Sequence, residues 1–66
     1  MNVKINHELK TITPNASLDT LLDELNIAKQ GIAVAINNII VTKSAWQKTV
    51  LKENDNVTII QATQGG

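Results

Sequence analysis

The two glycines that end the sequence, Gly65 and Gly66, are the residues with the clearest chemical use. Glycine loses more backbone freedom on ordering than any other residue, so a terminal pair adds little to a packed core. A thin terminus suits acyl chemistry, in which the Gly66 carboxylate becomes an acyl donor once ATP converts it to an acyl-adenylate. With Thr63 and Gln64 also extended, the end reaches at most about 14 Å from the domain. We therefore expect residues 63–66 to enter the active site of a partner enzyme.

The rest of the chain offers no catalytic machinery of its own. The sequence has no cysteine, so no side chain can supply sulfur or form a thioester. Paired carboxylates, a Ser-His or Cys-His combination and a Gly-rich phosphate loop are also absent from the sequence. His7 falls in a predicted turn without a second histidine, which indicates a solvated loop residue. We predict a carrier rather than an enzyme, with no catalytic residue, metal site or bound cofactor; ATP and Mg²⁺ would be used by the partner, where they stabilise charge on the phosphate.

Size and charge exclude several classes of protein. A chain of 66 residues, 42% of them hydrophobic, is one domain near the lower limit for a single core. Six lysines balance six acidic residues, and arginine is absent, so a basic face for nucleic acid is not expected. The first fifteen residues alternate polar and apolar types and resemble neither a signal peptide nor a membrane anchor. We expect a cytoplasmic protein with no nucleic-acid or membrane partner.

The first part of the chain predicts a β-hairpin. Val3 and Ile5 share one face of a short strand, and Leu9 and Ile12 lie in a second. The turn between them is assigned to residues 6–8, where asparagine comes first.

A leucine stripe next predicts an amphipathic helix. Its apolar positions are Leu18, Leu21, Leu22 and Leu25, which follow the i, i+3, i+4, i+7 pattern. Ser17 directly precedes them and is the expected N-cap. A helix with one apolar side needs a sheet to cover.

Three further strands are predicted after Gly31. Residues 32–36 are small or β-branched, and an Asn-Asn turn connects them to a short strand at residues 39–41. An irregular stretch follows and ends in a turn at residues 54–56. Residues 57–63 then form the most strand-like segment, with apolar residues on both parities, which is typical of a central strand.

Four side chains between the predicted strands are interpreted as structural. Trp46 is favoured as a packing residue over a docking residue, because it is the only aromatic side chain in the sequence. Asp19, Asp23 and Glu24 share the polar side of the predicted helix and are interpreted as a solvated face rather than a contact for a basic partner.

The order strand, strand, helix, strand, strand, strand limits the topology. With a right-handed crossover through the helix, the last strand lies beside the first, in parallel, at the centre of the sheet. This is an α+β fold of the β-grasp, or ubiquitin-like, type, with a mixed sheet of four to five strands packed on one helix. We assign residues 1–62 to the domain and residues 63–66 to a flexible tail.

The last strand also predicts a docking patch, because one helix covers only one face of the sheet. If Ile60 and Ala62 lie on the far face, they form an apolar patch that leads to the tail. The alternative exposes Val57 and Ile59 instead. Sequence parity leaves both arrangements open.

Three stretches carry a resemblance to a known family: SLDTLLDELNI, GIAVAINNIIVTKSAW and NDNVTIIQATQGG. Together they resemble the ThiS family, the sulfur carriers of thiazole formation in thiamine biosynthesis. The resemblance implies that Gly66 is adenylated and then converted to a thiocarboxylate. It implies three partners: an adenylating enzyme of the ubiquitin-activating type, a cysteine persulfide donor and a thiazole synthase. Thr63 and Gln64 depart from it, since they are more polar than the small apolar residues typical of the family.

Three other functions remain open at this stage. A molybdopterin-type sulfur carrier would use the same terminus, although such carriers are usually longer. A protein modifier would use the same adenylate but form an isopeptide with lysine. A non-covalent ubiquitin-like interaction module would not need Gly66 at all.

Overall fold

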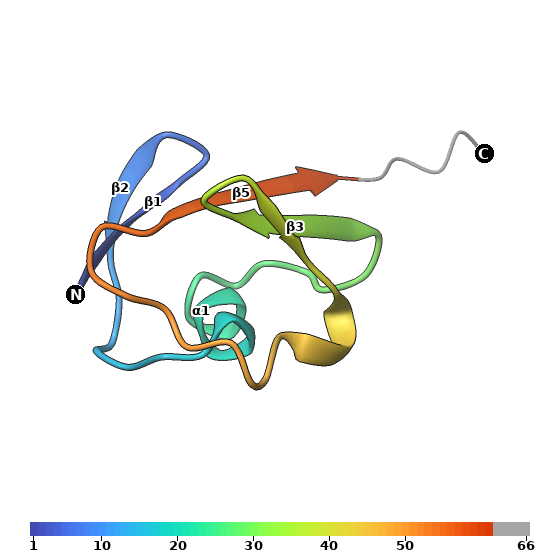
Figure 1. Ribbon diagram of the computed structural model, residues 1–66, viewed down its shortest axis with the longest axis horizontal. Helices are drawn as coiled ribbons and strands as arrows, with labels where there is room; N and C mark the ends of the chain where they lie inside the picture. Colours follow the sequence, from blue (N-terminus) through green and yellow to red (C-terminus); the bar gives the residue numbers. More distant parts are fainter. Residues whose placement is uncertain (62–66) are drawn as a thin grey trace.

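The computed structural model describes residues 1–61, which form one α-helix and a five-stranded sheet. In chain order, the elements are β1 (Asn2–Ile5), β2 (Glu8–Thr11), α1 (Leu18–Glu24), β3 (Ile32–Ile36), β4 (Ile39–Val41), the 3₁₀ turn η1 (Lys43–Ala45) and β5 (Asn56–Gln61). The strands lie in the order β2-β1-β5-β3-β4, and α1 covers one face of the sheet (Figure 1). The predicted β-grasp arrangement is confirmed.

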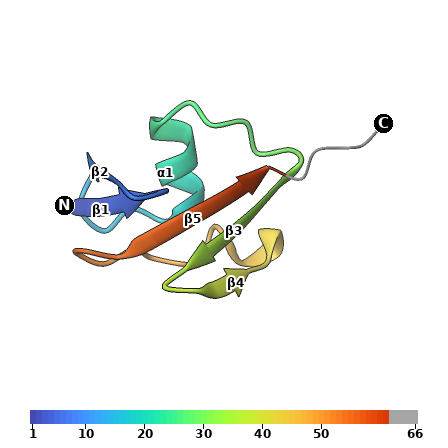
Figure 2. The ribbon, with the colours of Figure 1, turned by 90° about the horizontal axis from the view of Figure 1, so that it is seen from above.

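β5 is the central strand, as its apolar residues on both parities predict (Figure 2). It runs parallel to β1, with Ile5 beside Val57, and antiparallel to β3, with Ile32 beside Gln61. Asn56, which the sequence places in a turn, belongs to β5 because it already pairs with β1. The predicted parallel pairing of the first and last strands is therefore confirmed.

Both hairpins turn through two residues with positive φ. Asn6 and His7 have φ values of 50° and 72°, and Asn37 and Asn38 have values of 51° and 70°. Positive φ at both central positions defines a type I′ turn, whose twist matches that of the strands and which asparagine tolerates well. The predicted first turn is one residue too long, because Glu8 already pairs with β1.

α1 begins and packs as the leucine stripe predicts. The Ser17 hydroxyl accepts a hydrogen bond from the Thr20 N–H at 3.1 Å, which confirms the N-cap. The buried residues of the helix are Leu18, Leu21 and Leu22. Leu25 is the C-cap residue and is only partly buried. In the described part of the chain, no helix is long and apolar enough to cross a membrane.

The core lies between α1 and the sheet. The strand residues that pack with the helix leucines are Val3, Ile5, Val34 and Val57. Trp46 closes one side of this core with 2% of its surface exposed, and its indole N–H donates to the Val41 carbonyl at 3.0 Å. The interpretation of Trp46 as a packing residue is therefore confirmed.

The edge strand β2 departs from the predicted pattern. Leu9 is 63% exposed, while Ile12 is buried one residue beyond the end of the strand. There the Ile12 N–H donates to the Met1 carbonyl at 2.8 Å. The exposure of Leu9 follows from the position of β2 at the edge of the sheet, where the strand has little core to cover.

Candidate docking face and carrier terminus

β5 carries the predicted docking residue that the structure describes, Ile60. Val57 is fully buried and Ile59 is partly buried against the core, so this parity faces α1. Ile60 has the other parity and is 51% exposed on the opposite side of the sheet, which we call the open face. Of the two arrangements that the sequence allowed, the one with an exposed Ile60 occurs. Ala62 and residues 63–66 lie outside the described residues, and their roles stay predictions.

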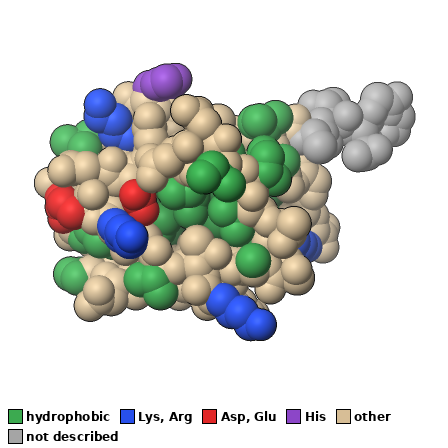
Figure 3. All heavy atoms as spheres, in the orientation of Figure 1, with side chains coloured by type: hydrophobic (Ala, Val, Ile, Leu, Met, Phe, Trp, Pro, Cys, Tyr) green, Lys and Arg blue, Asp and Glu red, His purple; other side chains and the backbone are tan. Residues whose placement is uncertain are grey.

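Ile60 belongs to a small apolar patch on the open face. Cross-strand pairing places Ala33 of β3 beside Ile60, and places Ala35 of β3 beside Ile40 of β4. Ile40 is 62% exposed, whereas Ala35 is buried between its neighbours. We call these four residues the open-face patch. In Figure 3, hydrophobic side chains reach the surface near the end of the described chain.

The open face carries little charge around this patch. Alternation along the strands places Lys4, Asn56 and Thr58 on this side together with Ile60. Among the residues of the five described strands, Lys4 is the only ionisable side chain on the open face. Apolar side chains cost nothing to desolvate and a buried charge costs the most, so the patch with its few charged neighbours suits contact with an apolar protein surface.

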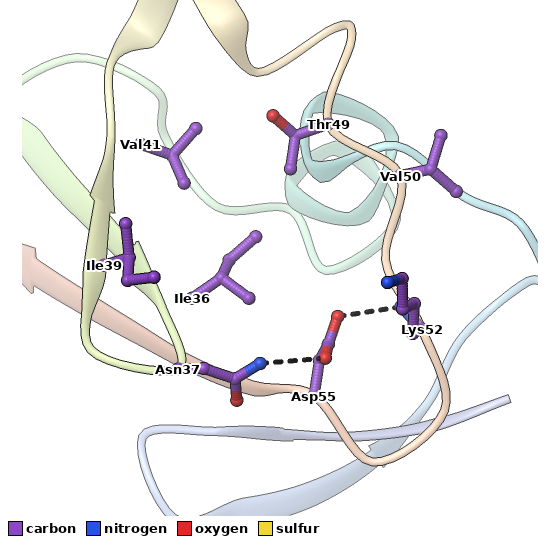
Figure 4. Close-up of a pocket in the computed structure, with 8 residues that line it drawn as sticks. All are labelled: Ile36, Asn37, Ile39, Val41, Thr49, Val50, Lys52 and Asp55. Atoms are coloured by element: carbon purple, nitrogen blue, oxygen red, sulfur yellow. Dashed lines mark hydrogen bonds between the residues drawn. The ribbon is translucent and has the colours of Figure 1, made fainter.

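A groove of about 300 Å³ opens beside β4, on the side of the sheet that α1 covers (Figure 4). Its apolar wall includes Ile36, Ile39 and Val50. Its carboxylate, from Asp55, accepts hydrogen bonds from the Asn37 amide at 3.1 Å and from the Lys52 N–H at 2.8 Å. These hydrogen bonds hold the chain before β5, so the Asp55 carboxylate serves a structural role here.

The acidic side chains of α1 make ion pairs and a hydrogen bond within the protein. The Lys29 ammonium lies 2.8 Å from Asp23 and 3.0 Å from Asp19. Hydrogen bonds to Asp23 and then Asp19 raise the pKa of Lys29 above its ordinary value of 10.5. Glu24 accepts from the Thr13 N–H at 3.3 Å. The three carboxylates therefore serve local contacts, in keeping with their interpretation as a solvated helix face.

His7 lies in the exposed turn between β1 and β2. Within residues 1–61, no three side chains of His, Cys, Asp or Glu come together in an arrangement that could hold a metal ion.

One contact near the candidate terminus could not be inferred from the sequence. The Asn6 side chain lies in the first turn, where the sequence indicated only a turn former, yet it hydrogen-bonds to the backbone of Ile59. No local pattern signals this contact, because 53 residues separate the two positions.

The model of the ThiS family matches residues 3–66 of this sequence. The chain belongs to the ThiS family. The match covers nearly the whole domain together with the terminal Gly65 and Gly66, and it agrees with the resemblance seen in the three sequence stretches.

One curated relative and two solved structures agree with this family. It is 26% identical to the sulfur carrier protein ThiS of Escherichia coli strain K12, over 100% of both chains. It matches the crystal structure of the thiamine biosynthesis protein ThiS from Geobacter metallireducens with a TM-score of 0.87 and 25% identity, over 100% of both chains. The solution structure of a Geobacter metallireducens thiamine biosynthesis protein gives a TM-score of 0.79 at 25% identity, covering 100% of this chain and 88% of that one.

Proposed function

We propose that this protein is the sulfur carrier of thiamine thiazole formation and that the Gly66 carboxylate is the group that carries the sulfur. The observation that supports this most strongly is the family match over residues 3–66, which includes both terminal glycines. The curated relative of the same length is named a sulfur carrier protein. This favours the thiazole carrier over the molybdopterin-type carrier.

The proposed chemistry takes place in partner enzymes. The Gly66 carboxylate attacks the α-phosphate of ATP, pyrophosphate leaves, and an acyl-adenylate forms, with Mg²⁺ held by the activating enzyme. The terminal sulfur of a cysteine persulfide then attacks the acyl carbon and displaces AMP. A thiol breaks the resulting S–S bond, becoming oxidised to a disulfide, and leaves the thiocarboxylate on Gly66. Thiazole synthase would accept this sulfur, and an oxygen atom that comes overall from water would replace it on the acyl carbon and return the carboxylate.

The domain supplies recognition and position in this scheme. The open-face patch around Ile60 is the proposed docking surface for the adenylating enzyme, because it is apolar, nearly uncharged and continuous with the strand that leads to the terminus. Gly65, Gln64 and Thr63 form the proposed tail, whose extended reach of about 14 Å suits entry into a narrow active site. No side chain of this protein takes part in bond breaking.

Intact mass spectrometry tests the proposal. The protein is incubated with ATP, Mg²⁺, an adenylating enzyme of the ubiquitin-activating type from the same organism and a persulfide donor, beside a chain that lacks Gly66. We expect one oxygen atom to be replaced by one sulfur atom in the full chain and no change in the shortened chain. An unchanged mass, with no acyl-adenylate formed although the enzyme binds, would instead support a non-covalent module. Stable adducts on lysines of other proteins would support a protein modifier.

A further inference from the structure

The two strands that flank β5, β1 and β3, pair with it over different lengths. β3 pairs with β5 as far as Gln61, whereas β1 ends at Ile5, beside Val57. The last backbone bond on the β1 side runs from the Asn6 N–H to the Val57 carbonyl, at 2.9 Å. Without a further contact, the β1 side of β5 would be open from Ile59 onward.

The Asn6 side chain provides that further contact. Its Oδ1 accepts a hydrogen bond from the Ile59 N–H at 2.8 Å, and its Nδ2 donates to the Ile59 carbonyl at 3.3 Å. In a regular parallel ladder, the backbone carbonyl of the residue at position 6 would accept from the Ile59 N–H. Asn6 has turned away with a φ of 50°, so the side-chain oxygen takes the place of the backbone oxygen.

Few residue types can make this contact. The position requires a positive φ, which glycine, asparagine and aspartate tolerate best. It also requires a donor and an acceptor on one planar group. Glycine has neither, and aspartate lacks the donor.

We propose that Asn6 is a positioning residue for the carrier terminus. Its amide holds the last part of β5 in the sheet and thereby fixes where the chain leaves the domain after Gln61. The inference rests on the proposed function in that the following residues must enter a partner enzyme. A terminus that leaves from a fixed strand has less conformational freedom to lose on binding, so the contact favours binding more than chemistry.

Asn37 offers a matched control at the other end of β5. It is also the first residue of a type I′ turn, with a φ of 51°, and its Oδ1 accepts from the Asn56 N–H at 3.0 Å. Asn6→Gly and Asn37→Gly each keep the turn geometry and remove one amide clamp. Only the Asn6 clamp lies towards the C-terminal end of β5, from which the chain continues to the terminus.

The experiment measures two properties of each full-length variant. Amide hydrogen exchange followed by NMR reports on two N–H groups: that of Ile59, which donates to Asn6, and that of Ile60, which faces β3. ATP–pyrophosphate exchange with the adenylating enzyme reports KM and kcat for the carrier. For Asn6→Gly we expect faster exchange at Ile59 by about fivefold and a KM higher by roughly three- to tenfold, with kcat nearly unchanged. For Asn37→Gly we expect nearly unchanged exchange at Ile59 and an unchanged KM.

Several outcomes would overturn the inference. Unchanged exchange at Ile59 in Asn6→Gly would show that the amide does not hold the strand. An equal rise in KM in both variants would assign the effect to general stability. If the unmodified protein is not adenylated at all, the proposed function fails, and the exchange rates of Ile59 and Ile60 still decide whether Asn6 fixes the end of the strand.

Discussion

The two faces of the sheet differ in what their side chains do. On the covered face, Val3 and Val57 are fully buried against the leucines of α1. On the open face, Ile60 and Ile40 have more than half of their surface exposed. Adjacent residues of β5 belong to opposite faces, so a single strand contributes both to the core and to the proposed docking surface. The comparison indicates that stability and recognition can be changed separately by substitutions one residue apart.

The largest expected effect comes from the covered face. Leu22→Ala removes a fully buried side chain, and such substitutions cost about 2–5 kcal/mol because of lost transfer energy and the cavity left behind. We expect the melting temperature, measured by circular dichroism, to fall by at least about 8 °C. Leu9→Ala is the matched control, since Leu9 is 63% exposed, and it should change stability by less than about 0.5 kcal/mol. Similar losses in both variants would contradict the division between the faces.

A substitution on the open face should change binding to the adenylating enzyme and leave stability nearly unchanged. Ile60→Ser exchanges a half-exposed apolar side chain for a polar one, and we expect affinity for the adenylating enzyme to fall about tenfold, because a central apolar contact is typically worth more than 1 kcal/mol. Isothermal titration calorimetry measures this, and thermal unfolding should show little change. Leu9→Ser alters an exposed leucine on the same face but on the distant strand β2. If it weakens binding equally, the open-face patch is not the docking surface.

The smallest expected effect concerns the solvent side of α1. The pKa of Lys29 is raised in the folded protein by Asp23 and then Asp19, so its ion pairs stabilise the fold fully below pH 10.5, and this contribution is lost as the pH rises through the raised value. Lys29→Gln should lower the melting temperature slightly and equally at pH 7 and pH 9. The difference should shrink at higher pH and in high salt, because these side chains are partly exposed. A difference that grows above pH 10.5 would contradict this assignment.

The sequence predicted those parts of the fold that depend on short-range patterns. Ser17 and the leucine stripe specify α1, because a cap and a 3.6-residue period are local properties. The asparagine turns specify two hairpins, since few residues accept positive φ. The end of β2 was less predictable, because the burial pattern of an edge strand does not mark where the strand stops. Leu9 is exposed within the strand, and Ile12 is buried after it.

The candidate site divides in the same way. The composition and order of the chain by themselves determined a helix on a mixed sheet. They also predict an acyl carrier that ends in Gly65 and Gly66, which stays a prediction. Only the tertiary structure decided that Ile60 faces away from α1, since alternation fixes which residues share a face but not which face the helix covers. Only the tertiary structure brought Asn6 to Ile59, because a hydrogen bond between residues 53 positions apart depends on how the first and last strands pair.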